Sequence, residues 1–183
     1  MEAKKSKDNM VWIDMEMTGL EVERERIIEM ASIVTDKNLN ILEEGPNLAI
    51  HQPNKILNSM DEWNQKHHKG SGLVDQVKAS KITVKKAEKI TMDFLKHYCL
   101  PGKSVLCGNA VHHDRRFISK YMPKLDKFLH YRHIDVTTLK VLIKWWYQKK
   151  NKEAFKKKDK HRALDDIRES IAELKFYREH FFK

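Results

Sequence analysis

Two acidic residues, Asp14 and Glu16, interrupt the otherwise hydrophobic segment MVWIDMEMTG. In a β-strand, side chains two residues apart point to the same face of the sheet, so both carboxylates would lie side by side. Like charges at that spacing repel unless a cation neutralises them, and carboxylate oxygens suit a hard ion such as Mg²⁺ or Mn²⁺. The same alternation is equally typical of an edge strand with a solvated polar face.

Acids and a histidine also occur where helices are predicted to begin. Asp114 follows the buried segment 104–109, and ligands in α/β sheets gather at such strand ends. A plain alternative for Asp114 is an acid that complements the helix dipole. The last helix begins with His161 and the pair Asp165-Asp166. His161 and Asp166 could face one site if His161 lies on the loop or first turn, but a surface histidine followed by capping acids is equally ordinary.

The elements that must position these residues alternate between strand and helix patterns. Strands are predicted at Val11–Glu16, Ile27–Asp36, Ile41–His51, Ser104–Asn109 and Arg132–Val136, and helices at Thr83–Tyr98, His112–Tyr121, about Thr137–Lys149 and about Arg162–Glu179, with short helical pieces within Asn58–Ala79. The second and third strands are separated by a tight turn and form an antiparallel meander. Strands mixed with crossover helices predict an α/β sandwich around a mixed sheet.

Length and composition indicate the class of protein. The 183 residues favour a single domain over 1–183. Residues 1–9 are polar, resemble no targeting leader, and are predicted to be a flexible tail. Two cysteines without a CxxC spacing indicate neither a disulfide framework nor a zinc knuckle. No apolar run has the length of a membrane span, so we expect no membrane association and a cytoplasmic location.

The charge of the chain favours a polyanionic partner. It has 36 Lys and Arg against 26 Asp and Glu, a net charge of +10. A basic surface speeds encounter with nucleic acid, although it can also serve solubility. The segment 149–160 (KKNKEAFKKKDK) contains almost nothing to bury and is predicted to be a mobile loop.

Together, these segments resemble the DEDD exonuclease superfamily, in the subclass whose base is a histidine. The stretches WIDMEMTGL, RIIEMASIVTD, CGN-x-x-x-x-DRRF and H-x-A-x-DDIRES are similar to the oligoribonuclease family, and the match extends from Trp12 to Phe181. The resemblance implies an RNase H-like mixed five-stranded sheet flanked by helices. It also implies a homodimeric exonuclease that degrades short single-stranded RNA, including dinucleotides, from the 3′ end to nucleoside 5′-monophosphates.

The resemblance assigns roles to particular residues. It implies four metal ligands and one general base, which are Asp14, Glu16, Asp114, Asp166 and His161. Two Mg²⁺ or Mn²⁺ ions would then activate a water and stabilise the departing 3′ oxygen. Asp165 is a rival for Asp166, because both lie off the apolar stripe of their helix (Leu164, Ile167, Ile171, Leu174) and only the family spacing selects one.

The resemblance also implies substrate contacts. Leu20 would wedge between two bases, and Trp63 and His68 would line the base and sugar pocket. Tyr131 and Arg132 of the partner subunit would cap the 5′ phosphate, a task that suits a guanidinium. Stacking on aromatic rings reads no base sequence.

Some of these assignments have alternatives. Leu20 and Trp63 could be core residues, and His67 competes with His68. Trp145 and Trp146 could belong to a dimer interface or to the core.

The chain departs from the family at three positions near the site, and one of them is Thr137, where a serine is usual. Ala110 stands where a small hydroxyl residue is usual, and His113 where a glutamine is usual, so secondary phosphate contacts are expected to differ. Two other functions compete with a short-RNA exonuclease. One is a related exonuclease on longer RNA or DNA, which Tyr131 and Arg132 argue against. The other is a catalytically silent nucleic-acid binder, which the complete set of acids argues against.

Overall fold

The fold is a mixed β-sheet, seen in a computed structural model that describes residues 5–147, 155 and 162–182. The strands are β1 (Met10–Met17), β2 (Ile27–Thr35), β3 (Ile41–Ala49), β4 (Leu106–Gly108) and β5 (His133–Asp135), in the order β3-β2-β1-β4-β5. β1 is antiparallel to β2 and parallel to β4, and β4 is parallel to β5. The predicted mixed five-stranded sheet and its β2–β3 meander are confirmed.

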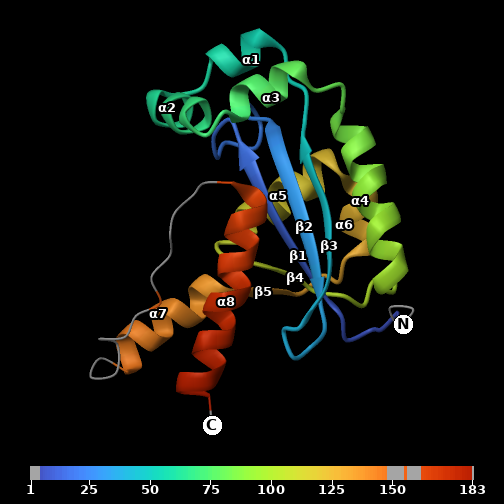
Figure 1. Ribbon diagram of the computed structural model, residues 1–183, viewed down its shortest axis with the longest axis vertical. Coiled ribbons are helices and arrows are strands. Elements are labelled where there is room, and N and C mark those ends of the chain that lie inside the picture. Colours follow the sequence, from blue (N-terminus) through green and yellow to red (C-terminus); the bar gives the residue numbers. More distant parts are fainter. Residues whose placement is uncertain (1–4, 148–154, 156–161, 183) are drawn as a thin grey trace.

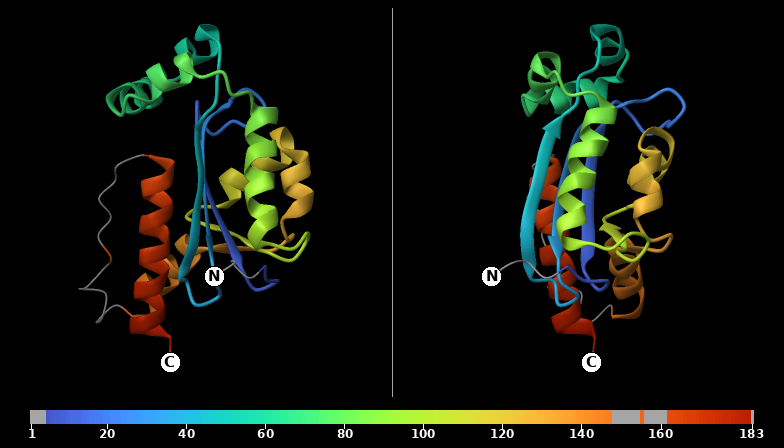
Figure 2. Two further views of the ribbon diagram at one scale, coloured as in Figure 1. Left: turned by 45° about the vertical axis from the view of Figure 1, so that its right-hand side comes forward. Right: turned by 90° about the vertical axis from the view of Figure 1, so that its right-hand side faces the viewer.

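Helices cover both faces of this sheet and one of its ends. They are α1 (Asn54–Asn58), α2 (Glu62–Gly70), α3 (Leu73–Ala79), α4 (Val84–Tyr98), α5 (His112–Tyr121), α6 (Pro123–Phe128), α7 (Val136–Trp146) and α8 (Ala163–Phe181). Figures 1 and 2 show α4, α5 and α6 on one face, α7 and α8 on the other, and α1 to α3 above the end of the sheet. The short helix α6 was not predicted from the sequence.

β1 is a central strand with a hydrophobic core on each side. Ile13 packs with Leu95 and Phe117 on the side of α4 and α5. Trp12 packs with Ile167 of α8 on the other side, and its indole Nε1 donates to Thr35 Oγ1 at 3.0 Å. Because both faces of β1 are covered, the alternative of a solvated edge strand is wrong.

α8 buries a more polar face than its apolar pattern predicted. Ile167 and Ile171 are buried as expected, whereas Leu164 and Leu174 are only partly covered. The rest of the buried face consists of Ala163, Ser170, Glu173 and Tyr177. Asn109, which follows β4, donates to Ser170 Oγ at 2.8 Å and to Glu173 Oε2 at 3.1 Å. These polar partners explain why a helix can bury two polar residues against the sheet.

The described part of the predicted tail lies against the end of α4. Ser6 N and Asn9 Nδ2 both donate to Tyr98 O, at 3.1 and 2.8 Å, and the Asn9 side chain is buried. Residues 5–9 are therefore anchored, in contrast to the predicted flexible tail. The predicted loop 149–160 lies outside the described residues except for Phe155, whose ring is 6.0 Å from that of Phe176. Among the helices of the described part, none has the length and apolar character needed to cross a membrane.

Candidate functional site

Three of the predicted ligands converge between β1 and α8. Asp14 and Glu16 lie on the same face of β1, which is the face that α8 covers, and Asp166 lies near the start of α8. One carboxylate oxygen from each of the three lies within 4.8 Å of the other two, and all three side chains are partly exposed. A metal ion that bound these oxygens could therefore also contact a substrate from solvent.

The structure separates Asp166 from its neighbour Asp165. Asp165 Oδ1 accepts a hydrogen bond from Arg168 Nη1 at 2.9 Å, and Arg168 pairs with Glu44 of the edge strand β3 at 2.6 Å. Asp165 thus belongs to a surface ion-pair network, whereas Asp166 belongs to the acidic cluster.

Asp114 is the fourth predicted ligand and lies on the other side of β1, in the first turn of α5. β4 ends at Gly108, and its last residue paired with β1 is Cys107, opposite Trp12. The N–H of Met15 therefore has no partner in β4, and it donates to Asp114 Oδ1 at 3.0 Å. The Asp114 side chain is buried, and its carboxylate completes the hydrogen bonding of β1. It also lies close enough to Glu16 for the two charges to interact.

The electrostatics of the cluster fit a cation. Burial, followed by the charges of Asp166, Glu29 and Asp114, raises the pKa of Glu16 to about 8. Burial also raises the pKa of Asp114 to about 8, against the lowering effect of its backbone hydrogen bonds. Crowded carboxylates favour the neutral form unless a positive charge lies among them. The donor set is oxygen only, which suits Mg²⁺ or Mn²⁺.

Two residues beside the cluster, Glu29 and Arg162, were not predicted from the sequence. Glu29 of β2 is paired with Glu16 in the β1–β2 register and is 1% exposed. Arg162, just before α8, binds it at 2.8 Å. The signal for Glu29 was available, because an acid in the apolar segment RIIEMA has the same character as Asp14 in β1. Arg162 offered no comparable signal, since an arginine beside acids is common on surfaces.

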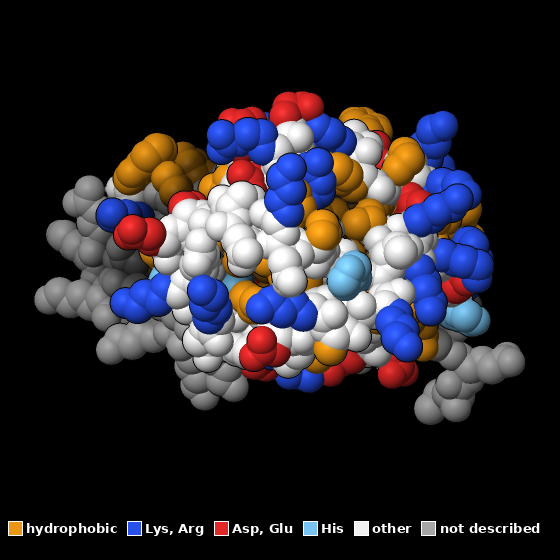
Figure 3. Space-filling view, turned by 90° about the horizontal axis from the view of Figure 1, so that it is seen from above, with side chains coloured by type: hydrophobic (Ala, Val, Ile, Leu, Met, Phe, Trp, Pro, Cys, Tyr) orange, Lys and Arg blue, Asp and Glu red, His pale blue; other side chains and the backbone are white. Residues whose placement is uncertain are grey.

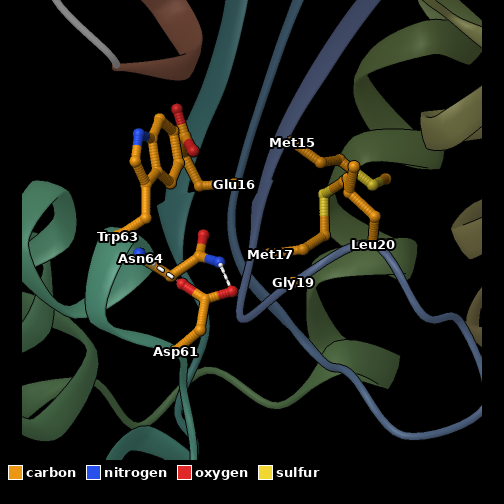
Figure 4. A pocket seen from close by; sticks show the side chains of 8 residues that line it. All are labelled: Met15, Glu16, Met17, Gly19, Leu20, Asp61, Trp63 and Asn64. Atoms are coloured by element: carbon orange, nitrogen blue, oxygen red, sulfur yellow. Dashed lines mark hydrogen bonds between the residues drawn. The ribbon is translucent and has the colours of Figure 1, made fainter.

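A groove of about 510 Å³ adjoins the cluster. Its lining consists of Met15, Glu16, Met17, Gly19, Leu20, Asp61, Trp63 and Asn64. In Figure 4, Trp63 lies beside Glu16 on one side, and Leu20 lies on the other side with the two methionines. Leu20 and Trp63 are each 57% exposed, so neither is a core residue.

Local hydrogen bonds hold both of these hydrophobic residues in place. Trp63 is in the first turn of α2, where Asp61 caps the helix by accepting from Asn64 N and Asn64 Nδ2, both at 2.8 Å (Figure 4). Leu20 belongs to the loop after β1, where Thr18 Oγ1 accepts from Arg26 N at 2.9 Å. The loop is therefore closed at its base.

The two histidines of α2 differ in burial and in contacts. His68 is 2% exposed, and its Nε2 lies 3.0 Å from Met17 O, while its Nδ1 lies 3.9 Å from Glu16 Oε2. It is absent from the groove lining and ties α2 to the end of β1. His67 is the histidine that stacks on Trp63, with ring centroids 3.9 Å apart. Helical spacing alone did not distinguish a buried histidine from a partly exposed one.

Tyr131 and Arg132 are exposed and lie outside the groove of their own chain. The Arg132 guanidinium lies 5.2 Å from the centre of the Tyr131 ring, which in turn stacks on His130. Arg115 fixes this segment, because its Nη1 donates to His130 O at 3.0 Å while its Nε pairs with Asp126 at 2.9 Å.

Of the remaining predicted positions, Ala110 and Thr137 lie side by side and His161 falls outside the described residues. Ala110 has a positive φ of 48°, and its N–H donates to Thr137 Oγ1 at 2.9 Å and Asp135 Oδ1 at 3.0 Å. Trp145 and Trp146 are exposed on α7, which excludes the alternative that they are core residues.

Comparison with known proteins gives consistent matches. The exonuclease family model (RNase_T) matches residues 11–174. An oligoribonuclease of Haemophilus influenzae is 58% identical over 177 residues, which cover 97% of each chain. An oligoribonuclease of Klebsiella pneumoniae is 56% identical over 178 residues, which cover 97% of this chain and 98% of the relative.

Solved structures share the fold at low sequence identity. Exonuclease I of E. coli in complex with a 5cy-dT13 oligonucleotide superposes with a TM-score of 0.71 at 15% identity, over 97% of this chain and 42% of that chain. A moderately thermophilic exonuclease I from Methylocaldum szegediense gives 0.71 at 15%, over 96% and 41%. The chain thus spans about two fifths of the length of these solved chains.

Proposed function

Because the chain belongs to the exonuclease family and, within it, to the oligoribonucleases, we propose that it hydrolyses short single-stranded RNAs, including dinucleotides, from the 3′ end. The products are nucleoside 5′-monophosphates. The single observation that best supports this proposal is the convergence of Asp14, Glu16 and Asp166 at the edge of a groove lined by Trp63 and Leu20. A protein that only bound nucleic acid would gain nothing from carboxylates that repel phosphate.

Two divalent cations, Mg²⁺ or Mn²⁺, are assigned to the carboxylates of Asp14, Glu16, Asp114 and Asp166. When bound, they would lower the pKa of a water and stabilise the departing 3′ oxygen. The fit of this assignment rests on the oxygen-only donors and on the crowding that raises the pKa of Glu16. The hydrogen bond from Met15 N keeps Asp114 directed at β1, close to the other acids.

His161 is proposed as the general base that accepts the proton of the attacking water. This assignment rests on the family resemblance, because His161 lies outside the described residues. A histidine is suited to the role, because its ordinary pKa lies near neutrality and its neutral form can accept a proton at pH 7.

The groove is proposed to hold the last two nucleotides. Trp63 would stack on one base, and Leu20 would separate it from the next, which requires both side chains to be exposed, as they are. Figure 3 looks onto the end of the molecule formed by α1 to α3, where Lys and Arg side chains are spread over the surface. The exposed lysines of these three helices are Lys55, Lys66, Lys69 and Lys78. These charges would attract a polyanion.

A homodimer is proposed to complete the substrate site. In a homodimer, Tyr131 and Arg132 of one protomer would cap the 5′ phosphate of RNA bound to the other, and their exposure outside the groove of their own chain supports this role. The exposed Trp145 and Trp146 are candidates for the interface. Cytoplasmic location is also proposed, and the two free cysteines, both buried, are consistent with a reducing compartment.

One assay tests the proposed function. Purified protein is incubated with 5′-labelled RNAs of two and of about twenty nucleotides, with Mg²⁺ or with EDTA, beside the variants Asp114→Ala and Arg132→Ala. We expect metal-dependent cleavage that favours the dinucleotide, abolished by Asp114→Ala, with the preference reduced by Arg132→Ala. Preferred cleavage of the long RNA would instead support an exonuclease for longer RNA or DNA, and absent turnover would support a silent binder.

A further inference from the structure

Glu29 is a buried carboxylate immediately beside the acidic cluster. It lies on β2 opposite Glu16 of β1, and it is 1% exposed. The described site assigns it no ligand role, because it is absent from the group formed by Asp14, Glu16 and Asp166. A buried carboxylate is costly unless its oxygens are paired, so its partners indicate what it does.

Those partners all belong to the start of α8. Arg162 donates to both Glu29 oxygens, from Nη2 at 2.8 Å and from Nε at 3.2 and 3.3 Å. Ala163 N, the first N–H of α8, donates to Glu29 Oε2 at 3.3 Å. Arg162 occupies the N-cap position of α8 without capping it by its own side chain. Glu29 of strand β2 therefore caps α8, although it is 134 residues away from Ala163 in the sequence.

This contact determines where the first turn of α8 meets the sheet. Asp166 N donates to Arg162 O at 3.0 Å, which makes Asp166 part of the turn that Glu29 and Arg162 hold. A second contact restrains Arg162, because its Nη2 also donates to Gln76 Oε1 of α3 at 3.0 Å. The fork of a guanidinium fixes direction as well as distance when it binds a carboxylate through two nitrogens.

We propose that Glu29 and Arg162 are positioning residues that hold Asp166 against Asp14 and Glu16 and thereby set the affinity of the cluster for a divalent cation. The proposal deepens the proposed function and rests on it, because it assumes that these three carboxylates bind the cation.

If Glu29 and Arg162 acted through their charges alone, removing one of them would weaken cation binding and removing the other would strengthen it. Arg162 places a positive charge near Glu16, so its removal would strengthen cation binding if charge alone mattered. Glu29 places a negative charge there, so its removal would weaken cation binding in either case. A positioning role requires both removals to weaken binding. Arg162→Met is therefore the decisive variant.

The test measures Mn²⁺ affinity in the full-length protein by titration calorimetry, together with the Mn²⁺-induced rise in Tm. The variants are Glu29→Gln, Arg162→Met and Arg162→Lys, each checked for a native circular dichroism spectrum. The matched control is Arg168→Met, because Arg168 also binds a carboxylate through two nitrogens, that of Glu44, and also links α8 to the sheet, but on the surface.

We expect Glu29→Gln and Arg162→Met each to weaken Mn²⁺ binding at least tenfold, Arg162→Lys to lose less, and Arg168→Met to match the wild type. Unchanged or tighter binding in a folded Arg162→Met protein would overturn the proposal. An equal loss of Mn²⁺ affinity in Arg168→Met would also overturn it, because breaking any link between α8 and the sheet would then weaken Mn²⁺ binding. Because no arm depends on turnover, a wild type that binds Mn²⁺ but fails to cleave RNA would count against the proposed function alone.

Discussion

The raised pKa of Glu16 makes a quantitative prediction about stability in the absence of metal. Its ordinary pKa of 4.5 is raised to about 8 in the folded protein, chiefly by burial and by Asp166. A carboxyl with a higher pKa in the folded state binds its proton more tightly there. Its contribution to stability is therefore present below pH 4.5 and is lost as the pH rises to about 8.

The size of this loss follows from the two pKa values. It amounts to about 3 kcal/mol at pH 7 and about 5 kcal/mol above pH 8, as an order of magnitude. The Glu16→Gln variant cannot ionise at this position. Between pH 5 and pH 8.5, its free energy of unfolding should consequently fall by about 3–5 kcal/mol less than that of the wild type.

Urea unfolding in EDTA, followed by tryptophan fluorescence at several pH values, measures this difference. Saturating Mg²⁺ should flatten the pH dependence of the wild type, because the cation binds the ionised carboxylates of the folded state. Glu44→Gln is the control. Arg168 lowers the pKa of Glu44, so replacing the Glu44 carboxylate should not reduce the fall in the free energy of unfolding as the pH rises. If wild type and Glu16→Gln lose stability equally as the pH rises, the electrostatic reasoning is refuted.

Two further predictions concern the groove and the backbone beside it. Trp63→Ala should raise the KM for a dinucleotide roughly 5- to 150-fold with little change in kcat, because a stacked base contributes about 1–3 kcal/mol. Steady-state kinetics showing a lower kcat at unchanged KM would contradict this. Ala110→Gly should raise the free energy of unfolding by about 0.5–1 kcal/mol, because the φ of 48° is strained for alanine and not for glycine; urea unfolding that shows a less stable variant would disprove the strain.

The sheet and the long helices were predictable because their signals are local. Alternation and helical periodicity identified β1, β2 and β3 within two residues at each end, and the acids of β1 drew attention to the site. α6 was missed because it is a six-residue helix that begins at a proline and depends on a contact outside itself. In that contact, the N–H of Lys124 in the first turn of α6 donates to Glu88 of α4 at 2.7 Å.

The parts of the site that could not be predicted depend on contacts distant in sequence. Nothing in the spacing of Asp165 and Asp166 separates a surface acid from a clustered one, because the difference comes from how α8 crosses β1. The same holds for His68, which is buried and contacts Met17 O, 51 residues away in the sequence. The pairing of Glu29 with Arg162 is likewise visible only once α8 lies over β2.

The central claim is that Asp14, Glu16 and Asp166 form a site for a divalent cation, and Asp165 offers the closest control. Mn²⁺ binding is measured by titration calorimetry on the wild type, Asp165→Asn and Asp166→Asn, which change neighbouring residues by the same chemistry. The structure predicts that Asp165→Asn binds Mn²⁺ as the wild type does and that Asp166→Asn binds it at least tenfold more weakly. Equal affinities in all three proteins, or a loss confined to Asp165→Asn, would contradict the claim.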